Sequence, residues 1–153
     1  MTSSTDRIER KIVLRAPRTR VWRAITDSGE FGEWFGVKLE GPFERGAHVR
    51  GKMANAKYAH LPFELWIDTV DPESRFSYRW HPFAIEVGVD YSKEPTTLVE
   101  FTLADAAGGT LLTLVESGFD AVPPARRAKA FEMNSHGWEM QAQQIEKYLA
   151  HAS

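Results

Sequence analysis

The sequence contains no cysteine among its 153 residues. This absence excludes disulfide bonds, thiolate metal sites, cysteine nucleophiles and cysteine-ligated iron–sulfur clusters. It also fits a reducing compartment, and we expect a cytoplasmic protein. The N-terminus has no apolar segment typical of a secretory signal. No apolar run approaches the roughly 20 residues that span a bilayer, so no membrane span is expected.

An excess of charge of one sign is also missing, since the net charge is −2. We therefore expect no nucleic-acid partner. Residues 1–23 are locally basic, which indicates either solvated faces or a docking patch for an acidic partner. The histidines show no metal-binding spacing and no glycine-rich phosphate loop is present, so we expect no metal and no cofactor.

Aromatic residues, in contrast, make up 12% of the chain, with five Trp and nine Phe. So many rings predict either a dense core or a cavity lined by rings. The pattern separates them into two sets. The first belongs to two short helices and is expected to pack there: Trp22, Phe31, Trp34 and Phe35. The second is expected to meet across one interior: Phe76, Tyr78, Trp80, Phe131 and Trp138.

Hydrophobic periodicity predicts a single α+β domain over residues 1–153, with residues 1–7 flexible. Short turns such as 71–74 and 107–109 join neighbouring strands and predict an antiparallel sheet. The connection 81–96 is long enough to form a rim or lid. Ser28 is the expected cap of the second helix. The expected helices are 17–26, 28–35 and 125–151, and the expected strands are 8–14, 37–41, 47–54, 62–70, 74–80, 97–104 and 109–118.

The C-terminal helix carries amides within an otherwise apolar stripe. Phe131, Asn134, Trp138 and Gln141 recur at spacings of three and four residues, which places them on one helical face. A buried amide without partners is costly. Asn134 and Gln141 therefore either bond neighbouring backbone or face a wet or ligand-filled cavity.

Two strands add further polar groups to faces that are otherwise apolar. Glu116 shares a face with Leu114, and Tyr78 shares one with Trp80. A carboxylate on a core face needs a partner or water. Glu116 is therefore either part of a structural ion pair or at a strand end already in solvent, or else it is a polar anchor or a general acid or base inside a cavity. The aromatic face serves either core packing or the lining of a site.

Five segments resemble one family in the right order: APRTRVWRAITDSGEFGEWFG (16–36), DPESRFSYRW (71–80), EPTTLVEFTL (94–103), GGTLLTLVESGF (108–119) and NSHGWEMQAQQIEKYL (134–149). They resemble the START-like (SRPBCC) superfamily, in the branch similar to the C-terminal domain of heat-shock chaperone ATPase activators (Aha-type). The resemblance implies a helix-grip fold, in which a curved antiparallel sheet wraps around a long C-terminal helix and encloses a mostly apolar cavity. Relatives usually carry Leu where this chain has Ala142, a change that would widen the cavity.

The leading functional hypothesis is binding of a small apolar or aromatic molecule in this cavity. One alternative is an enzyme of the polyketide-cyclase or hydrolase type with Glu116 or His81 as acid or base, although no catalytic residue is assigned. Another is an interaction module like the chaperone activators; a chaperone is the less favoured partner, because the chain is too short for their additional N-terminal domain. A homodimer is left open. The candidate ligand-binding residues are Tyr78, Trp80, Leu114, Glu116, Phe131, Asn134, Trp138 and Gln141.

Overall fold

The structure is a computed structural model that describes residues 6–57, 62–82 and 91–151. The predicted α+β class is confirmed, and each predicted element ends within two residues of its expected bounds. The short helix η1 was not predicted. The elements are β1 (Arg7–Leu14), α1 (Arg18–Thr26), α2 (Ser28–Phe35), β2 (Val37–Glu40), β3 (His48–Met53), β4 (Pro62–Asp71), β5 (Arg75–Trp80), β6 (Thr97–Ala106), β7 (Gly109–Ser117), η1 (Phe119–Ala121) and α3 (Pro124–His151).

The described strands form one antiparallel sheet in the order β1-β7-β6-β5-β4-β3-β2. Both predicted tight turns are present, and each uses a residue with positive φ: Glu73 at 58° and Gly108 at 81°. The β4–β5 register shifts between Ile67 and Thr69. Such an irregularity bends a strand and increases its twist, which helps this sheet to curve.

The two short helices are set by their end residues. The Asp27 side chain accepts a hydrogen bond from the Glu30 backbone N–H at 2.9 Å and caps α2. The expectation that Ser28 is this cap is wrong, since Ser28 is already the first helical residue. Gly36 ends α2 in the left-handed conformation (φ 92°), as expected for a glycine at this position.

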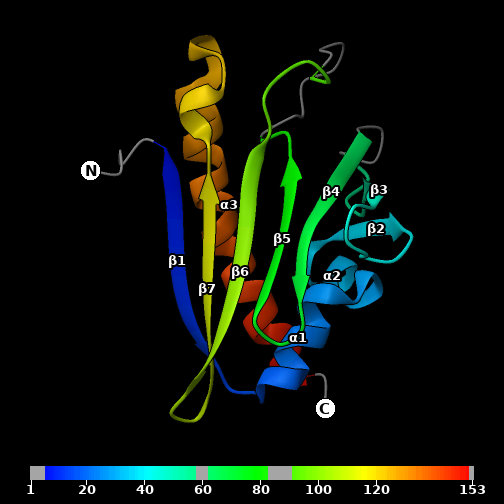
Figure 1. The fold of residues 1–153 in the computed structure, drawn as a ribbon, viewed down its shortest axis with the longest axis vertical. Coiled ribbons are helices and arrows are strands. Elements are labelled where there is room, and N and C mark those ends of the chain that lie inside the picture. Colours follow the sequence, from blue (N-terminus) through cyan, green and yellow to red (C-terminus); the bar gives the residue numbers. More distant parts are fainter. Residues whose placement is uncertain (1–5, 58–61, 83–90, 152–153) are drawn as a thin grey trace.

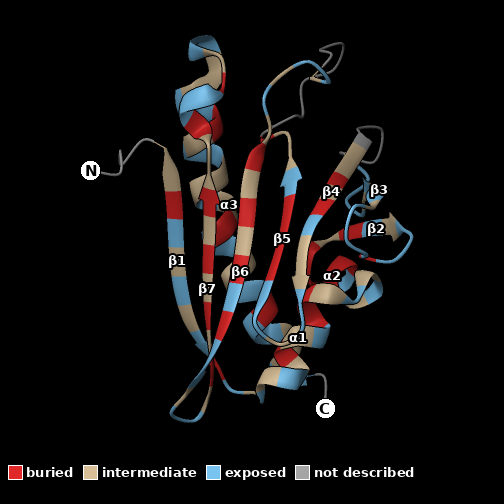
Figure 2. Ribbon diagram, in the orientation of Figure 1, coloured by how far each residue is buried: buried red, intermediate tan, exposed pale blue. Residues whose placement is uncertain are grey.

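Helix α3 runs along one face of the sheet, and α1 and α2 lie at the end of the sheet near the α3 C-terminus (Figure 1). Buried and more exposed residues alternate along the strands (Figure 2), so one face of the sheet supplies the core. This is the helix-grip arrangement that the resemblance implies. None of the described helices is both long and apolar enough to cross a bilayer.

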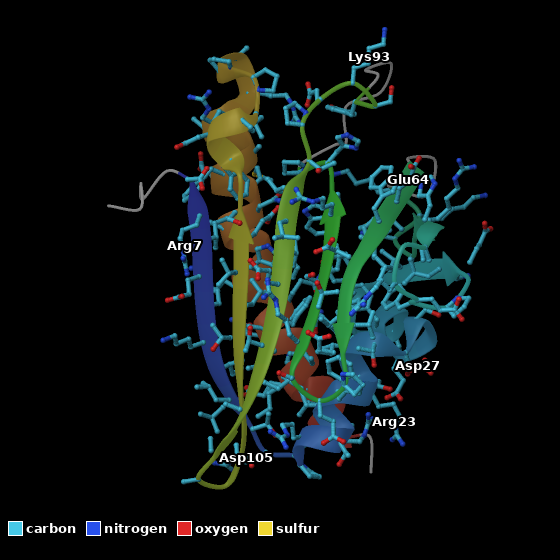
Figure 3. All side chains as sticks on the ribbon, viewed as in Figure 1. Arg7, Arg23, Asp27, Glu64, Lys93 and Asp105 are labelled. Carbon is cyan, nitrogen blue, oxygen red and sulfur yellow. The ribbon has the colours of Figure 1, made fainter. Side chains whose placement is uncertain are left out.

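The basic N-terminal segment is largely paired within the chain. Arg10 donates to the Ser135 hydroxyl on α3 at 2.8 Å. Arg7 and Arg23 lie on different sides of the molecule (Figure 3), so these cations do not form one surface patch. The internal contacts therefore account for much of this charge without an acidic partner. The ion pairs are Arg7–Glu9, Arg18–Glu73, Arg18–Asp105, Arg20–Glu30 and Arg23–Glu30.

Candidate functional site

Glu116 is a fully buried carboxylate at the centre of a polar cluster between the sheet and α3. The Thr97 hydroxyl donates to Glu116 Oε2 at 2.5 Å, and the Trp80 indole N–H donates to the same oxygen at 2.7 Å. The Trp138 indole N–H donates to Oε1 at 2.7 Å. The Asn134 amide contacts both oxygens, at 3.0 and 3.1 Å. The carboxylate therefore joins β5, β6 and β7 to α3.

The partners of Glu116 are all neutral donors. Burial raises the pKa of Glu116, and hydrogen bonds from Thr97, the two indoles and Asn134 lower it only in part. A carboxylate offers about four lone-pair positions. The four donors, with the Asn134 nitrogen shared between the two oxygens, fill these positions, so a ligand would have to displace one of them to bond Glu116. The hydrogen bonds of Glu116 thus link the sheet to α3 and stabilise the packing between them.

Aromatic rings surround this polar cluster. The Trp80 and Trp138 rings stack at 5.6 Å, and Phe35 contacts both at 5.9 and 6.0 Å. Tyr78 lies 5.3 Å from Trp80, edge to face, and 6.2 Å from Phe31. The rings of α2 were expected to pack separately. They instead join those of the sheet and α3, because α2 covers the same sheet face.

Two buried polar atoms in this region have no hydrogen-bond partner among the described residues. One is the hydroxyl of Tyr78, a residue that is 0% exposed. Burial, together with the negative charge of Glu116, raises the pKa of Tyr78 well above its ordinary value. The other atom is Gln141 Oε1; the amide nitrogen of Gln141 donates to the Phe35 carbonyl at 2.9 Å. Orphaned buried polar atoms are rare, so these two need an explanation.

The structure gathers most of the candidate residues. Trp80, Glu116, Asn134 and Trp138 meet directly through the hydrogen bonds above, and Tyr78 touches the Trp80 ring. Gln141 bonds backbone, as one of the two alternatives had it, and keeps one atom unpartnered, whereas Asn134 bonds a buried carboxylate, which neither alternative included.

Other candidates lie at the margin of the cluster or outside it. Leu114 is buried on the same strand face as Glu116. Phe131 contacts Phe119 of η1 at 5.2 Å. The helix that holds Phe119 was not predicted, and Phe119 provides Phe131 with a packing partner near the start of α3.

His81 does not reach Glu116 through any described contact. Its Nε2 lies 3.1 Å from the Glu94 carbonyl, and its ring meets Trp66 edge to face at 5.5 Å. Trp66 lies between the buried residues Leu65 and Ile67 on β4, so it points to the opposite face of the sheet from the core. The His81 ring thus contacts the outer face of the sheet, while its partner Glu94 pairs with Arg126 near the start of α3 at 2.8 Å.

Sequence reasoning missed Thr97 and the role of Phe35. Thr97 is fully buried and stands in period two with Val99 and Phe101, so strand alternation carried a usable signal. No comparable signal existed for Phe35, because its contacts with Trp80 and Trp138 depend on how α2 packs against the sheet.

Residues 15–150 match the family described as Activator of Hsp90 ATPase homolog 1-like protein. The chain belongs to this family. The resemblance to the START-like superfamily and its Aha-type branch is thereby confirmed. No curated protein matches the chain in sequence.

Solved structures resemble this family member over nearly its whole length. DynU16, a protein of the dynemicin biosynthetic locus, has 27% identity and a TM-score of 0.73; the match covers 97% of this chain and 48% of DynU16. This chain thus spans about half the length of DynU16. Protein MLL2253 from Mesorhizobium loti has 21% identity and a TM-score of 0.76, with 96% and 98% of the two chains covered. Protein NE0264 from Nitrosomonas europaea has 19% identity and a TM-score of 0.76, with coverages of 100% and 99%. The last two show a shared fold.

Proposed function

We propose that the protein binds a small apolar or aromatic molecule between the sheet and α3, beside Tyr78 and Gln141. The observation that carries the proposal is the pair of buried polar atoms without a partner, Tyr78 OH and Gln141 Oε1. Both border the aromatic cluster, whose rings would supply apolar contact while the two atoms orient a polar group. A bound molecule would offset the cost of leaving these atoms unpaired.

Exposure indicates from which side such a molecule would enter. Trp80, Phe63 and Gln141 are half-buried, whereas Tyr78 and Trp138 next to them are buried. Phe63 contacts the Trp80 ring at 6.0 Å. A ligand would meet Phe63, Trp80 and Gln141 first and then approach the Tyr78 hydroxyl.

Binding without catalysis is the role that this geometry favours. Four donors fill the lone-pair positions of Glu116, and no described contact joins His81 to Glu116, Tyr78 or Gln141. The likeness to DynU16, a protein of a biosynthetic locus, agrees with a role toward small molecules. A cyclase or hydrolase would need an acid or base that reaches the bound molecule, and the contacts of these two candidates do not favour that role.

The test uses Nile red, a neutral apolar dye, in fluorescence titration, together with native mass spectrometry of the purified protein. We expect saturable binding of one dye per chain, or a co-purified small molecule of defined mass. Gln141→Arg should abolish binding by placing a cation among the rings. The same substitution at Gln144, an exposed residue on α3, should leave binding intact. Equal binding to both variants, or none to the parent protein, would contradict the proposal.

The description of the family supports a second proposal, an interaction with a chaperone ATPase. It is tested separately by adding the protein to the cognate chaperone and measuring ATP hydrolysis. Stimulation that survives Gln141→Arg would show that chaperone contact and small-molecule binding use different surfaces. Absence of stimulation would remove this second role.

A further inference from the structure

The buried charge next to the aromatic cluster is the negative charge of Glu116. Among the described residues, Glu116 is the charged side chain that is buried. The half-buried Arg20 forms an ion pair with Glu30 and covers the Tyr148 ring. Arg126, also half-buried, forms an ion pair with Glu94 and covers the Tyr91 ring. A ligand carboxylate next to Tyr78 would therefore lie close to an anion in a medium of low dielectric, without a cation to balance it.

The unpartnered atoms also define which hydrogen bonds a ligand must make. Gln141 Oε1 is an acceptor and can be satisfied only by a donor. The Tyr78 hydroxyl can donate or accept. An alcohol or phenol can supply both needs, because a hydroxyl donates one bond and accepts others. A methyl ether has no donor and leaves Gln141 unsatisfied.

The lone pairs of Glu116 argue against a cationic ligand. An ammonium group would need a carboxylate oxygen with a free position, and Thr97, Trp80, Trp138 and Asn134 already occupy both oxygens. Displacing any of these donors would orphan a buried polar hydrogen, which costs about as much as a lost hydrogen bond.

We infer that the ligand is a neutral, ring-containing hydroxy compound, read by Tyr78 OH and Gln141 Oε1. The inference rests on the proposed function and names the chemical class that the same site accepts. The rings near Tyr78 favour a planar ligand, since Trp80, Phe76 and Phe101 lie 5.3, 5.9 and 6.2 Å from it. Glu116 takes no bond from the ligand.

The experiment measures displacement of Nile red, checked by calorimetry, with four two-ring probes: 2-naphthol, 2-methoxynaphthalene, 2-naphthoate and 1-naphthylmethylammonium. We expect 2-naphthol to bind most tightly. The ether should bind about two- to tenfold more weakly, which is the typical worth of one neutral hydrogen bond. Neither charged probe should compete at the concentration at which 2-naphthol saturates. Equal competition by all four, or tighter binding of either charged probe, would overturn the inference while leaving ligand binding intact. Failure of Nile red and all four probes would instead overturn the proposed function.

The variant Tyr78→Phe tests whether the Tyr78 hydroxyl binds the ligand or only stabilises the fold. The hydroxyl has no protein partner, so its removal should leave the unfolding temperature unchanged or raise it. Affinity for 2-naphthol and for 2-methoxynaphthalene should both fall about two- to tenfold, because either oxygen can accept a bond from Tyr78. Gln141→Met should instead reduce the preference for 2-naphthol over the ether, because it removes the acceptor that only a hydroxyl can satisfy. A loss of stability in Tyr78→Phe with unchanged affinity for both probes, or an unchanged preference in Gln141→Met, would contradict the assignment.

Discussion

Two carboxylates hold α3 against the rest of the molecule, and they do so with opposite electrostatics. Glu116 is fully buried and is bonded by neutral donors, among them Asn134 and Trp138 from the middle of α3. Glu30 is 19% exposed and pairs with Arg20 and Arg23 at 2.7 and 2.8 Å. Glu30 also accepts a bond from the hydroxyl of Tyr148, near the end of α3, at 2.6 Å.

The surroundings of the two carboxylates shift their pKa values in opposite directions. Burial raises the pKa of both groups, but at Glu30 the hydrogen bonds from Tyr148 and Arg20 and the nearby cations outweigh it and lower the pKa. At Glu116 burial dominates and the pKa is raised. The Glu30 cluster resembles an ordinary structural ion network. The Glu116 cluster consists of a carboxylate and neutral donors, and the inferred ligand class depends on this lack of a cation among its described partners.

The largest expected effect comes from removing each carboxylate. Glu116→Leu leaves two indole N–H groups, a hydroxyl and an amide without an acceptor, so we expect a loss of about 3–5 kcal/mol in the free energy of unfolding. Glu30→Leu should cost about 1–2 kcal/mol, because its partners can turn to water. Urea denaturation with circular dichroism measures both. Equal losses would remove the distinction between the two clusters; if Glu116→Leu does not fold, Glu116→Gln serves in its place.

A smaller effect is expected from one donor at a time. Trp138→Phe keeps a ring beside Trp80 but removes the N–H bond to Glu116, and we expect a loss of about 1.5–3 kcal/mol, the range for bonds to charged groups. Tyr148→Phe removes the matching bond to Glu30, where Arg20 and Arg23 remain as partners, so it should cost less. Urea denaturation of the two variants tests this order, and a larger loss for Tyr148→Phe would contradict it.

The pH dependence of stability should have opposite signs at the two sites. The lowered pKa of Glu30 means that its contribution is present above the unfolded pKa and is lost as pH falls through the folded pKa. The raised pKa of Glu116 means that its contribution is fully present below the unfolded pKa and is lost as pH rises through the folded pKa. Between pH 7 and about 3, the stability difference between wild type and Glu116→Gln should therefore widen, and that between wild type and Glu30→Gln should shrink once the pH falls below the ordinary glutamate pKa of about 4.3. Chemical denaturation across this range checks both signs, and two differences that move together would refute the assignment.

Salt should give the smallest effect. Raising NaCl from about 0.05 to 1 M shortens the Debye length to about 3 Å and weakens partly exposed ion pairs. The stability difference between wild type and Glu30→Gln should fall by a few tenths of a kcal/mol. The difference between wild type and Glu116→Gln should stay constant, because its donors are neutral and buried. A salt response of equal size at Glu116 would point to a cation in its surroundings.

Sequence patterns were sufficient for the elements but only partly for the site. Period-two alternation placed Glu116 on the core face, and the spacing of α3 placed Asn134 and Trp138 together. Neither pattern shows how the strands pair or which turn of α3 packs against which strand residues. The sequence therefore could not predict that four donors would meet at one carboxylate. The contact of Phe131 with Phe119 was not predictable either, because Phe119 lies in a helical turn too short to leave a periodic signal.

A crystal structure of the protein grown with 2-naphthol would show whether Tyr78 and Gln141 bind the ligand. We expect ring density beside Trp80, with the naphthol oxygen within hydrogen-bond distance of Tyr78 OH or Gln141 Oε1. Glu116 should keep its bonds to Thr97, Trp80, Trp138 and Asn134. A naphthol oxygen bonded to Glu116 in place of one of these donors, or density on another surface of the molecule, would contradict the account.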